Sequence, residues 1–106
     1  MNVYINTYDS LISNEELDQL LPNVPTDCRI SLWNLSITQT GYGHWIISVE
    51  LEINGEKEIY STITTNSTAI DAYNDKDDEE RSSEGFKELL SEVLSKNADE
   101  IEATAL

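Results

Sequence analysis

The sequence is short of cysteine and of long apolar runs, and both shortages limit where the protein can work. Its one cysteine, Cys28, cannot form an intramolecular disulfide bond, so a reducing, cytoplasmic setting is expected. No stretch approaches the roughly 20 apolar residues that a membrane-spanning helix needs. Residues 1–8 also lack the basic and apolar regions of a signal peptide. We therefore expect a cytoplasmic protein that does not bind membranes.

The sequence also lacks the motifs that accompany catalysis. It has no phosphate-binding loop, dinucleotide-binding glycine pattern, nucleophile elbow or HExxH motif. His44 is the only histidine, and no histidine lies near Cys28 in sequence to activate it. The acidic run from Asp75 fails as an EF-hand, because Glu80 and Phe86 stand where glycine and glutamate are needed. We expect no enzymatic activity, no metal site and no cofactor.

Basic residues are scarce, and the resulting negative charge is the main feature of the composition. Twenty-one acids against six lysines and arginines give a formal net charge of −15. Such an excess repels nucleic acid and anionic membranes. The chain is nevertheless 39% hydrophobic, with two tryptophans and five tyrosines, so it can fold and is not a disordered acidic tail. Two interpretations of the charge stay open, namely solubility and attraction to a basic surface.

The length and the hydrophobic pattern predict one α+β domain over residues 1–106. Residues 2–8 alternate loosely, as in a short strand. The capping box of Ser13 and Glu16 starts a short N-terminal helix, which Pro22 ends. Residues 29–38 form a strand whose alternation changes phase between Leu32 and Leu35, which indicates a bulge or burial on both faces.

Two further strands, His44–Ile53 and Glu56–Thr64, form a hairpin around Asn54-Gly55. We predict a three-residue loop closed by Gly55, because that register pairs Val49 with Ile59 and Trp45 with Ile63 and keeps one face apolar. The same register sets Glu52 opposite Glu56 and Glu50 opposite Glu58. The sheet then has three antiparallel strands, with residues 2–8 as a fourth.

The last third of the chain is predicted to be helical and acidic, with twelve acids against four bases in residues 71–102. Asn66 or Ser67 caps a short helix that contains Ile70 and Tyr73. Ser82 or Ser83 caps an amphipathic helix over residues 83–97, which should pack on the Trp45/Ile47/Val49 side of the sheet. Its apolar stripe is formed by Phe86, Leu89, Leu90, Val93 and Leu94. Ile101 extends this stripe, and the final residues are expected to fray.

Two acidic clusters are the candidate partner-binding sites. Like charges opposite each other destabilise a hairpin, so paired strand glutamates are difficult to explain by folding. An alternative is that they only prevent aggregation at an exposed edge. The first cluster consists of Glu50, Glu52, Glu56 and Glu58, and the second of Asp75, Asp77, Asp78, Glu79 and Glu80.

Aromatic side chains could anchor a partner beside these clusters. Trp33, Tyr42 and Tyr60 are the candidates. Packing in the core is the more common role of such residues, and we expect it for Trp33 and Trp45.

In its length, its charge and its hairpin His44–Thr64 followed by acidic helices, the chain resembles small acidic inhibitors encoded by phages and mobile elements. This group includes anti-CRISPR and anti-restriction proteins that mimic DNA. The resemblance covers the whole chain by overall character and involves no specific motif. It implies a stoichiometric inhibitor in a bacterial host cell that occupies the basic nucleic-acid-binding site of a defence complex, such as a CRISPR effector or a nuclease.

Two other functions are consistent with the same residues. One is an immunity protein that neutralises a cationic nuclease toxin, and the other is a non-enzymatic acidic adaptor. None of these readings involves direct binding of nucleic acid, and a homo-oligomer stays open.

Overall fold

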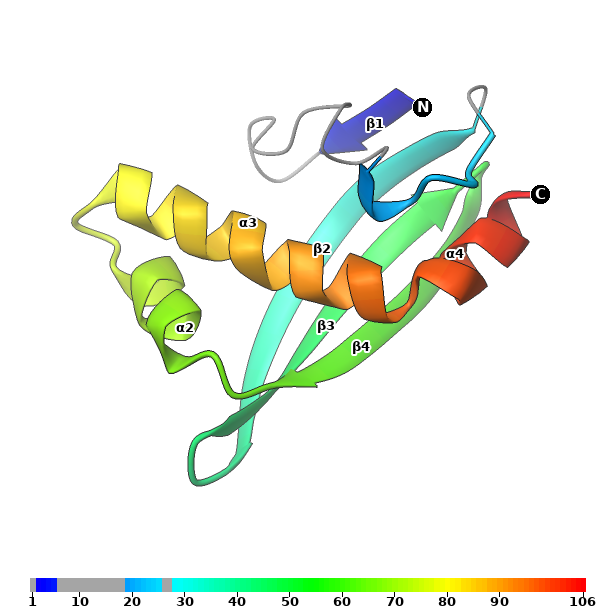
Figure 1. Ribbon diagram of the computed structural model, residues 1–106. Helices are drawn as coiled ribbons and strands as arrows, with labels where there is room; N and C mark the ends of the chain where they lie inside the picture. Colours follow the sequence, from blue (N-terminus) through cyan, green and yellow to red (C-terminus); the bar gives the residue numbers. More distant parts are fainter. Residues whose placement is uncertain (1, 6–18, 26–27) are drawn as a thin grey trace.

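A four-stranded sheet forms one layer of the protein, and helices form the other (Figure 1). The computed structural model describes residues 2–5, 19–25 and 28–106. The strands lie in the order β1-β2-β3-β4, and β1 pairs in parallel with β2 while the other pairs are antiparallel. Their bounds are β1 Asn2–Ile5, β2 Arg29–Gly41, β3 His44–Ile53 and β4 Glu56–Thr64; the helices are α2 Ser67–Asn74, α3 Glu79–Lys96 and α4 Ala98–Ala105.

The predicted α+β class is confirmed, including the three antiparallel strands. A fourth strand does lie near the N-terminus, but it pairs in parallel with β2, whereas an antiparallel sheet of three to four strands was predicted. Most of the predicted N-terminal helix, with its capping box of Ser13 and Glu16, lies outside the described residues. Gln19 and Leu20 are helical, and the helix ends before Pro22 as expected. None of the helices in the described part of the chain is long and apolar enough to cross a membrane.

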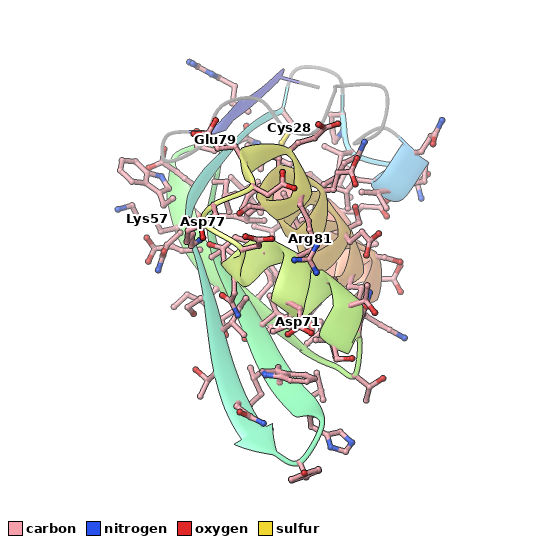
Figure 2. All side chains as sticks on the ribbon, turned by 90° about the vertical axis from the view of Figure 1, so that its left-hand side faces the viewer. Cys28, Lys57, Asp71, Asp77, Glu79 and Arg81 are labelled. Carbon is pink, nitrogen blue, oxygen red and sulfur yellow. The ribbon has the colours of Figure 1, made fainter. Side chains whose placement is uncertain are left out.

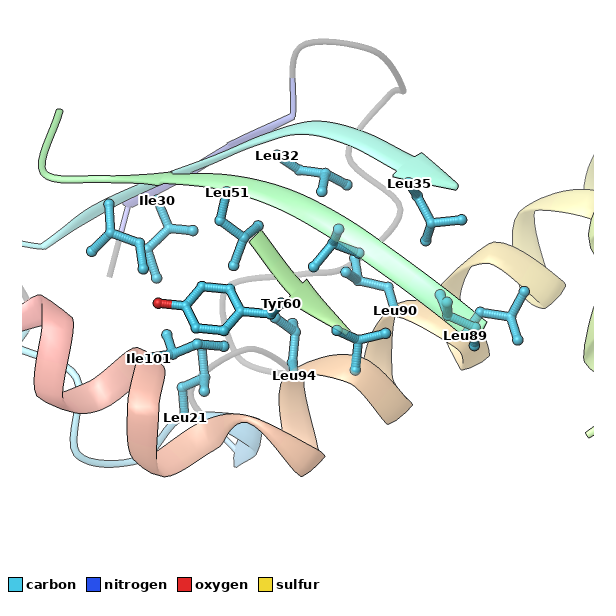
Figure 3. Close-up of a cluster of buried hydrophobic side chains, with 14 of the residues drawn as sticks. Leu21, Ile30, Leu32, Leu35, Leu51, Tyr60, Leu89, Leu90, Leu94 and Ile101 are labelled. Carbon is cyan, nitrogen blue, oxygen red and sulfur yellow. The ribbon is translucent and has the colours of Figure 1, made fainter. Parts of the chain in front are cut away.

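The hydrophobic core lies between the sheet and α3 (Figure 3). The apolar stripe of α3 is buried, as its i, i+3, i+4 spacing predicts. It packs against a sheet face that carries Ile47 and Val49, both almost fully buried, with Trp45 partly buried at the margin. This confirms the predicted packing of the amphipathic helix. Cys28 is buried in the same core, as an ordinary apolar residue would be.

A β-bulge in β2 explains the change of phase in its sequence. The pairing of β2 with β3 shifts register between Leu32 and Asn34, so Leu32 and Leu35 both point into the core. Trp33 is the extra residue at this shift, and it is 38% exposed. The expectation that Trp33 packs in the core was therefore wrong, because the bulge turns its side chain toward the opposite face.

The predicted hairpin register was also wrong. Ile53 pairs with Glu56, so the loop has two residues and not three. Asn54 and Gly55 have φ angles of 51° and 90°, as a type I′ turn requires at both central positions. The prediction assumed that the isoleucines of β4 face the core. In fact Tyr60 and Thr64 face it, and local turn geometry sets the register because β4 is an edge strand.

The helix α3 begins at Glu79, four residues before the predicted start at residue 83. Asp78 is its N-cap, and the Asp78 side chain accepts a hydrogen bond from the Arg81 backbone N–H at 3.1 Å. Aspartate caps a helix as well as serine does, and Glu79 and Glu80 in the first turn interact favourably with the helix dipole. The sequence of the acidic run 75–80 is compatible with a mobile loop or with a solvated helix start, and its last residues form the cap and first turn of α3.

The chain after α3 forms a separate packed helix and does not fray. Asn97 separates α3 from α4, and its Nδ2 donates hydrogen bonds to the carbonyl oxygens of Val93 at 2.9 Å and Ser61 at 3.0 Å. Ile101 and Ala105 of α4 are both buried. The predicted cap of α2 is correct, since the Asn66 side chain accepts from the Ala69 backbone N–H.

Candidate functional site

The four strand glutamates do not form one acidic row. In the observed register Glu50 lies opposite Ile59 and Glu52 lies opposite Lys57. Glu56 and Glu58 pair with the core residues Ile53 and Leu51, so they lie on the other face of the sheet, exposed at its edge. The predicted like-charge pairs across the hairpin are therefore absent. Mutual repulsion thus gives no evidence that the strand glutamates serve binding.

The second predicted cluster surrounds the start of α3, where several of its acids have a role in folding (Figure 2). Asp75 forms an ion pair with Arg81, with Oδ2 and Nη1 2.9 Å apart. Asp78 is the helix cap, and Glu79 and Glu80 lie in the first helical turn. Asp77 is exposed. Folding alone thus explains most of this cluster.

A third acidic feature, which the sequence reading missed, runs along α3. Four glutamates recur at every fourth residue, so they lie on one side of the helix with a rise of roughly 6 Å between neighbours. We call them the α3 acidic stripe: Glu80, Glu84, Glu88 and Glu92. A shallow open hollow follows the stripe, lined by Asn66, Glu84, Lys87, Glu88, Ser91 and Glu92.

Repulsion between like charges in the stripe destabilises α3. The same effect was wrongly predicted for the glutamates of the hairpin. Each like-charge pair at i, i+4 destabilises a helix by roughly 0.2–0.5 kcal/mol, so three successive pairs cost on the order of 1 kcal/mol. Lys87 lies on the same side of the helix and offsets part of this repulsion. The signal for the stripe is present in the sequence, because glutamates recur every four residues within the segment predicted to be helical.

Two members of the stripe bond to the end of β4, but those bonds do not need a charge. Thr64 Oγ1 is buried and donates to Glu92 at 2.9 Å and 3.1 Å, and Asn66 Nδ2 donates to Glu88 at 3.4 Å. A glutamine carbonyl oxygen would accept the same bonds. The negative charges of the stripe therefore exceed what this packing requires.

The candidate aromatic anchors differ in exposure. Tyr60 is buried and its hydroxyl donates to Thr104 at 3.3 Å, so it is a core residue. Tyr42 is fully exposed at the tip of the β2–β3 hairpin, beside the exposed His44. The Trp33 ring lies beneath Lys57, with Nζ 4.2 Å from the ring centroid. Trp33 and Tyr42 remain as surface aromatics.

Glu102 is the one buried acid among the described residues. Its Oε2 has no hydrogen-bond partner within the part of the chain that the structure describes. In the same ranges, no three residues of the histidine, cysteine, aspartate and glutamate types are grouped so as to hold a metal ion.

Comparison of the chain with protein-family models, with curated proteins and with solved structures returned no match.

Proposed function

We propose that the protein is a stoichiometric, non-enzymatic inhibitor that binds a basic nucleic-acid-binding surface of a host defence complex in the bacterial cytoplasm. The observation that supports this proposal is the α3 acidic stripe, which places regularly spaced negative charge on an open surface at a cost to the helix. Carboxylates repeated along a rigid helix offer lysines and arginines of a nucleic-acid-binding site an alternative to phosphates.

The core of the proposed surface consists of acids whose charge is not needed for the bonds to Thr64 and Asn66. These are Glu84, Glu88 and Glu92 along α3, with Asp77 and Glu79 extending the surface at the helix start. Only Lys87 among the described bases shares the hollow beside the stripe. Because the charges are held by one helix, they need no reordering on binding, which favours affinity.

A displacement assay tests the proposal directly. Labelled DNA is bound to a purified, guide-loaded CRISPR effector, to a restriction enzyme and to a cationic nuclease toxin, and the protein is titrated into each complex. We expect release of DNA from at least one complex, with an apparent affinity that falls steeply between 50 and 500 mM salt. Absence of release throughout this panel would refute the proposal, and release from the nuclease alone would favour an immunity protein.

Neutral variants show whether the stripe is responsible. The triple variant Glu84→Gln, Glu88→Gln, Glu92→Gln keeps the acceptors for Thr64 and Asn66 while it removes three charges. A control variant of equal charge replaces acids outside the proposed surface: Asp71→Asn, Asp99→Asn and Glu100→Gln. We expect affinity to fall at least tenfold in the first variant and much less in the second. Equal losses would mean that net charge alone matters.

A further inference from the structure

One face of the sheet carries no described helix, and three large apolar side chains are exposed on it among polar ones. The helix α3 packs on the opposite face, with α2 and α4 beside it (Figure 1), and Lys57 projects from the side away from the helices (Figure 2). We call this the open face. Ile59 and Ile63 of β4 are 68% and 64% exposed on it, and the Trp33 ring lies beneath Lys57 on the same side.

Contacts between its own side chains order the open face, and this arrangement suits binding of an apolar surface. Ser48 and Ser61 lie between the two isoleucines and hydrogen-bond to each other at 2.8 Å, so these hydroxyls satisfy one another. The Lys57 ammonium group holds the Trp33 ring by a cation–π contact, and Glu52 lies opposite Lys57 in the strand pair. The side chains of the face are thus arranged before any partner arrives.

The size of the face indicates what could cover it. Three strands spaced about 4.8 Å apart and about eight residues long make a surface of roughly 14 by 26 Å, on the order of 400 Å². A stable complex buries about 800 Å² on each partner. A second copy stacked on this face alone would fall short of that area, and two chains of net charge −15 repel each other.

We propose that the open face binds the same basic partner and supplies the apolar part of the interface, an inference that rests on the proposed function. Charge complementarity selects this occupant, because Glu50 and Glu52 lie on the open face itself, opposite Ile59 and Lys57. The partner presents apolar side chains surrounded by lysines and arginines. The apolar side chains pack on Ile59, Ile63 and Trp33, and the basic groups contact the surrounding carboxylates.

The test separates the apolar contact from the electrostatic one. The double variant Ile59→Thr, Ile63→Thr removes exposed apolar surface while it keeps β-branched residues that suit a strand. Its control is Leu106→Ser, which removes an exposed apolar side chain at the end of α4, away from the open face. Affinity is measured by calorimetry with the complex from which the protein releases DNA, at several salt concentrations, and each variant's thermal unfolding is recorded.

We expect the double variant to bind that complex at least tenfold more weakly, with an unchanged salt dependence, and Leu106→Ser to bind like the parent. Unchanged affinity of the double variant, with weakened binding by the glutamine triple variant, would overturn this inference and leave the proposed function intact. If the triple variant also bound normally, neither the α3 acidic stripe nor the open face would be the binding surface. A concentration-dependent dimer in analytical ultracentrifugation that the double variant abolishes, with partner binding unaffected, would assign the open face to a second copy.

Discussion

At the scale of single residues, Asn54 connects three parts of the fold that are distant in sequence. Its backbone N–H donates to the Arg29 carbonyl oxygen at 2.9 Å, and its Oδ1 accepts from the Arg29 backbone N–H at 3.0 Å. Its Nδ2 donates to the Ala105 carbonyl oxygen at 3.4 Å. The start of β2, the β3–β4 turn and the end of α4 therefore meet at one side chain, which also adopts a positive φ angle.

We predict that Asn54→Ala lowers the free energy of unfolding by about 2 kcal/mol, because it removes two hydrogen bonds and places a Cβ-bearing residue with no polar side chain at positive φ. Asn54→Gly is the matched variant, since glycine accepts the φ angle and lacks only the bonds. Its loss should be about 1 kcal/mol. Urea unfolding monitored by tryptophan fluorescence measures both values. Equal losses would mean that the backbone conformation contributes nothing.

The exposure of the Trp33 side chain could not be predicted from sequence. The phase change around it indicated a bulge, but two structures were compatible with the pattern, and only one of them exposes the indole. Composition favours burial of tryptophan, whereas the local backbone decides the side on which the ring lies. The sequence thus predicts the bulge, but it does not predict that the bulge exposes the Trp33 ring.

At the scale of elements, the close crossing of α2 and α3 depends on Gly85. A Cβ atom at this position would lie 2.5 Å from the Tyr73 backbone nitrogen and 2.7 Å from the Ala69 carbonyl oxygen. Both contacts are to backbone, so the helices would have to separate to relieve them. The ring centroids of Tyr73 and Phe86, which lie 6.1 Å apart across this crossing, would separate as well.

We predict that Gly85→Ala destabilises the protein by about 1–2 kcal/mol, although alanine favours a helix by roughly 1 kcal/mol over glycine. The midpoint of thermal unfolding should fall by about 4–8 °C for each kcal/mol. Gly41→Ala is the control, because a Cβ there meets nothing within 4 Å. Its stability should match that of the parent within about 0.5 kcal/mol. A Gly85→Ala variant as stable as the parent would show that the helices repack freely.

Elements were predictable where one strong periodic signal extends over many residues, as in the buried stripe of α3 and the clean alternation of β3. The errors concern element ends. The hairpin register depends on an edge strand, where apolar alternation is a weak guide because one side of the strand lacks a neighbour. The start of α3 was hidden because Asp78 stands within a charge run that reads equally well as loop.

For the whole molecule, the net charge was evident from composition, but its distribution was not. The strand glutamates were assigned to one surface through an incorrect register, and the observed pairing divides them between two faces. The stripe on α3 follows from helical geometry once the helix is established. A candidate site that consists of charged residues therefore depends on the fold, because the fold decides which of these residues share a surface.

Because the charges are distributed in this way, measurements of stability can test whether the negative charge serves binding or solubility. Self-repulsion at a net charge of −15 destabilises the compact state, and added salt screens it over a Debye length of about 10 Å at 0.1 M. We predict that raising NaCl from 20 to 500 mM increases the midpoint of thermal unfolding by several degrees. In the triple variant Glu84→Gln, Glu88→Gln, Glu92→Gln, with a net charge of −15 + 3 = −12, the increase should be smaller, and at 20 mM NaCl the variant should be more stable than the parent.

Differential scanning calorimetry of the parent, the triple variant and the equal-charge control measures this effect. Glutamine and glutamate have similar helix propensities, so the comparison isolates charge. A midpoint that does not change with salt would contradict the prediction. A triple variant that is more stable and yet binds its partner weakly would mean that the stripe is maintained for binding at the expense of stability. If the more stable variant binds as well as the parent, the carboxylates of α3 contribute only to solubility.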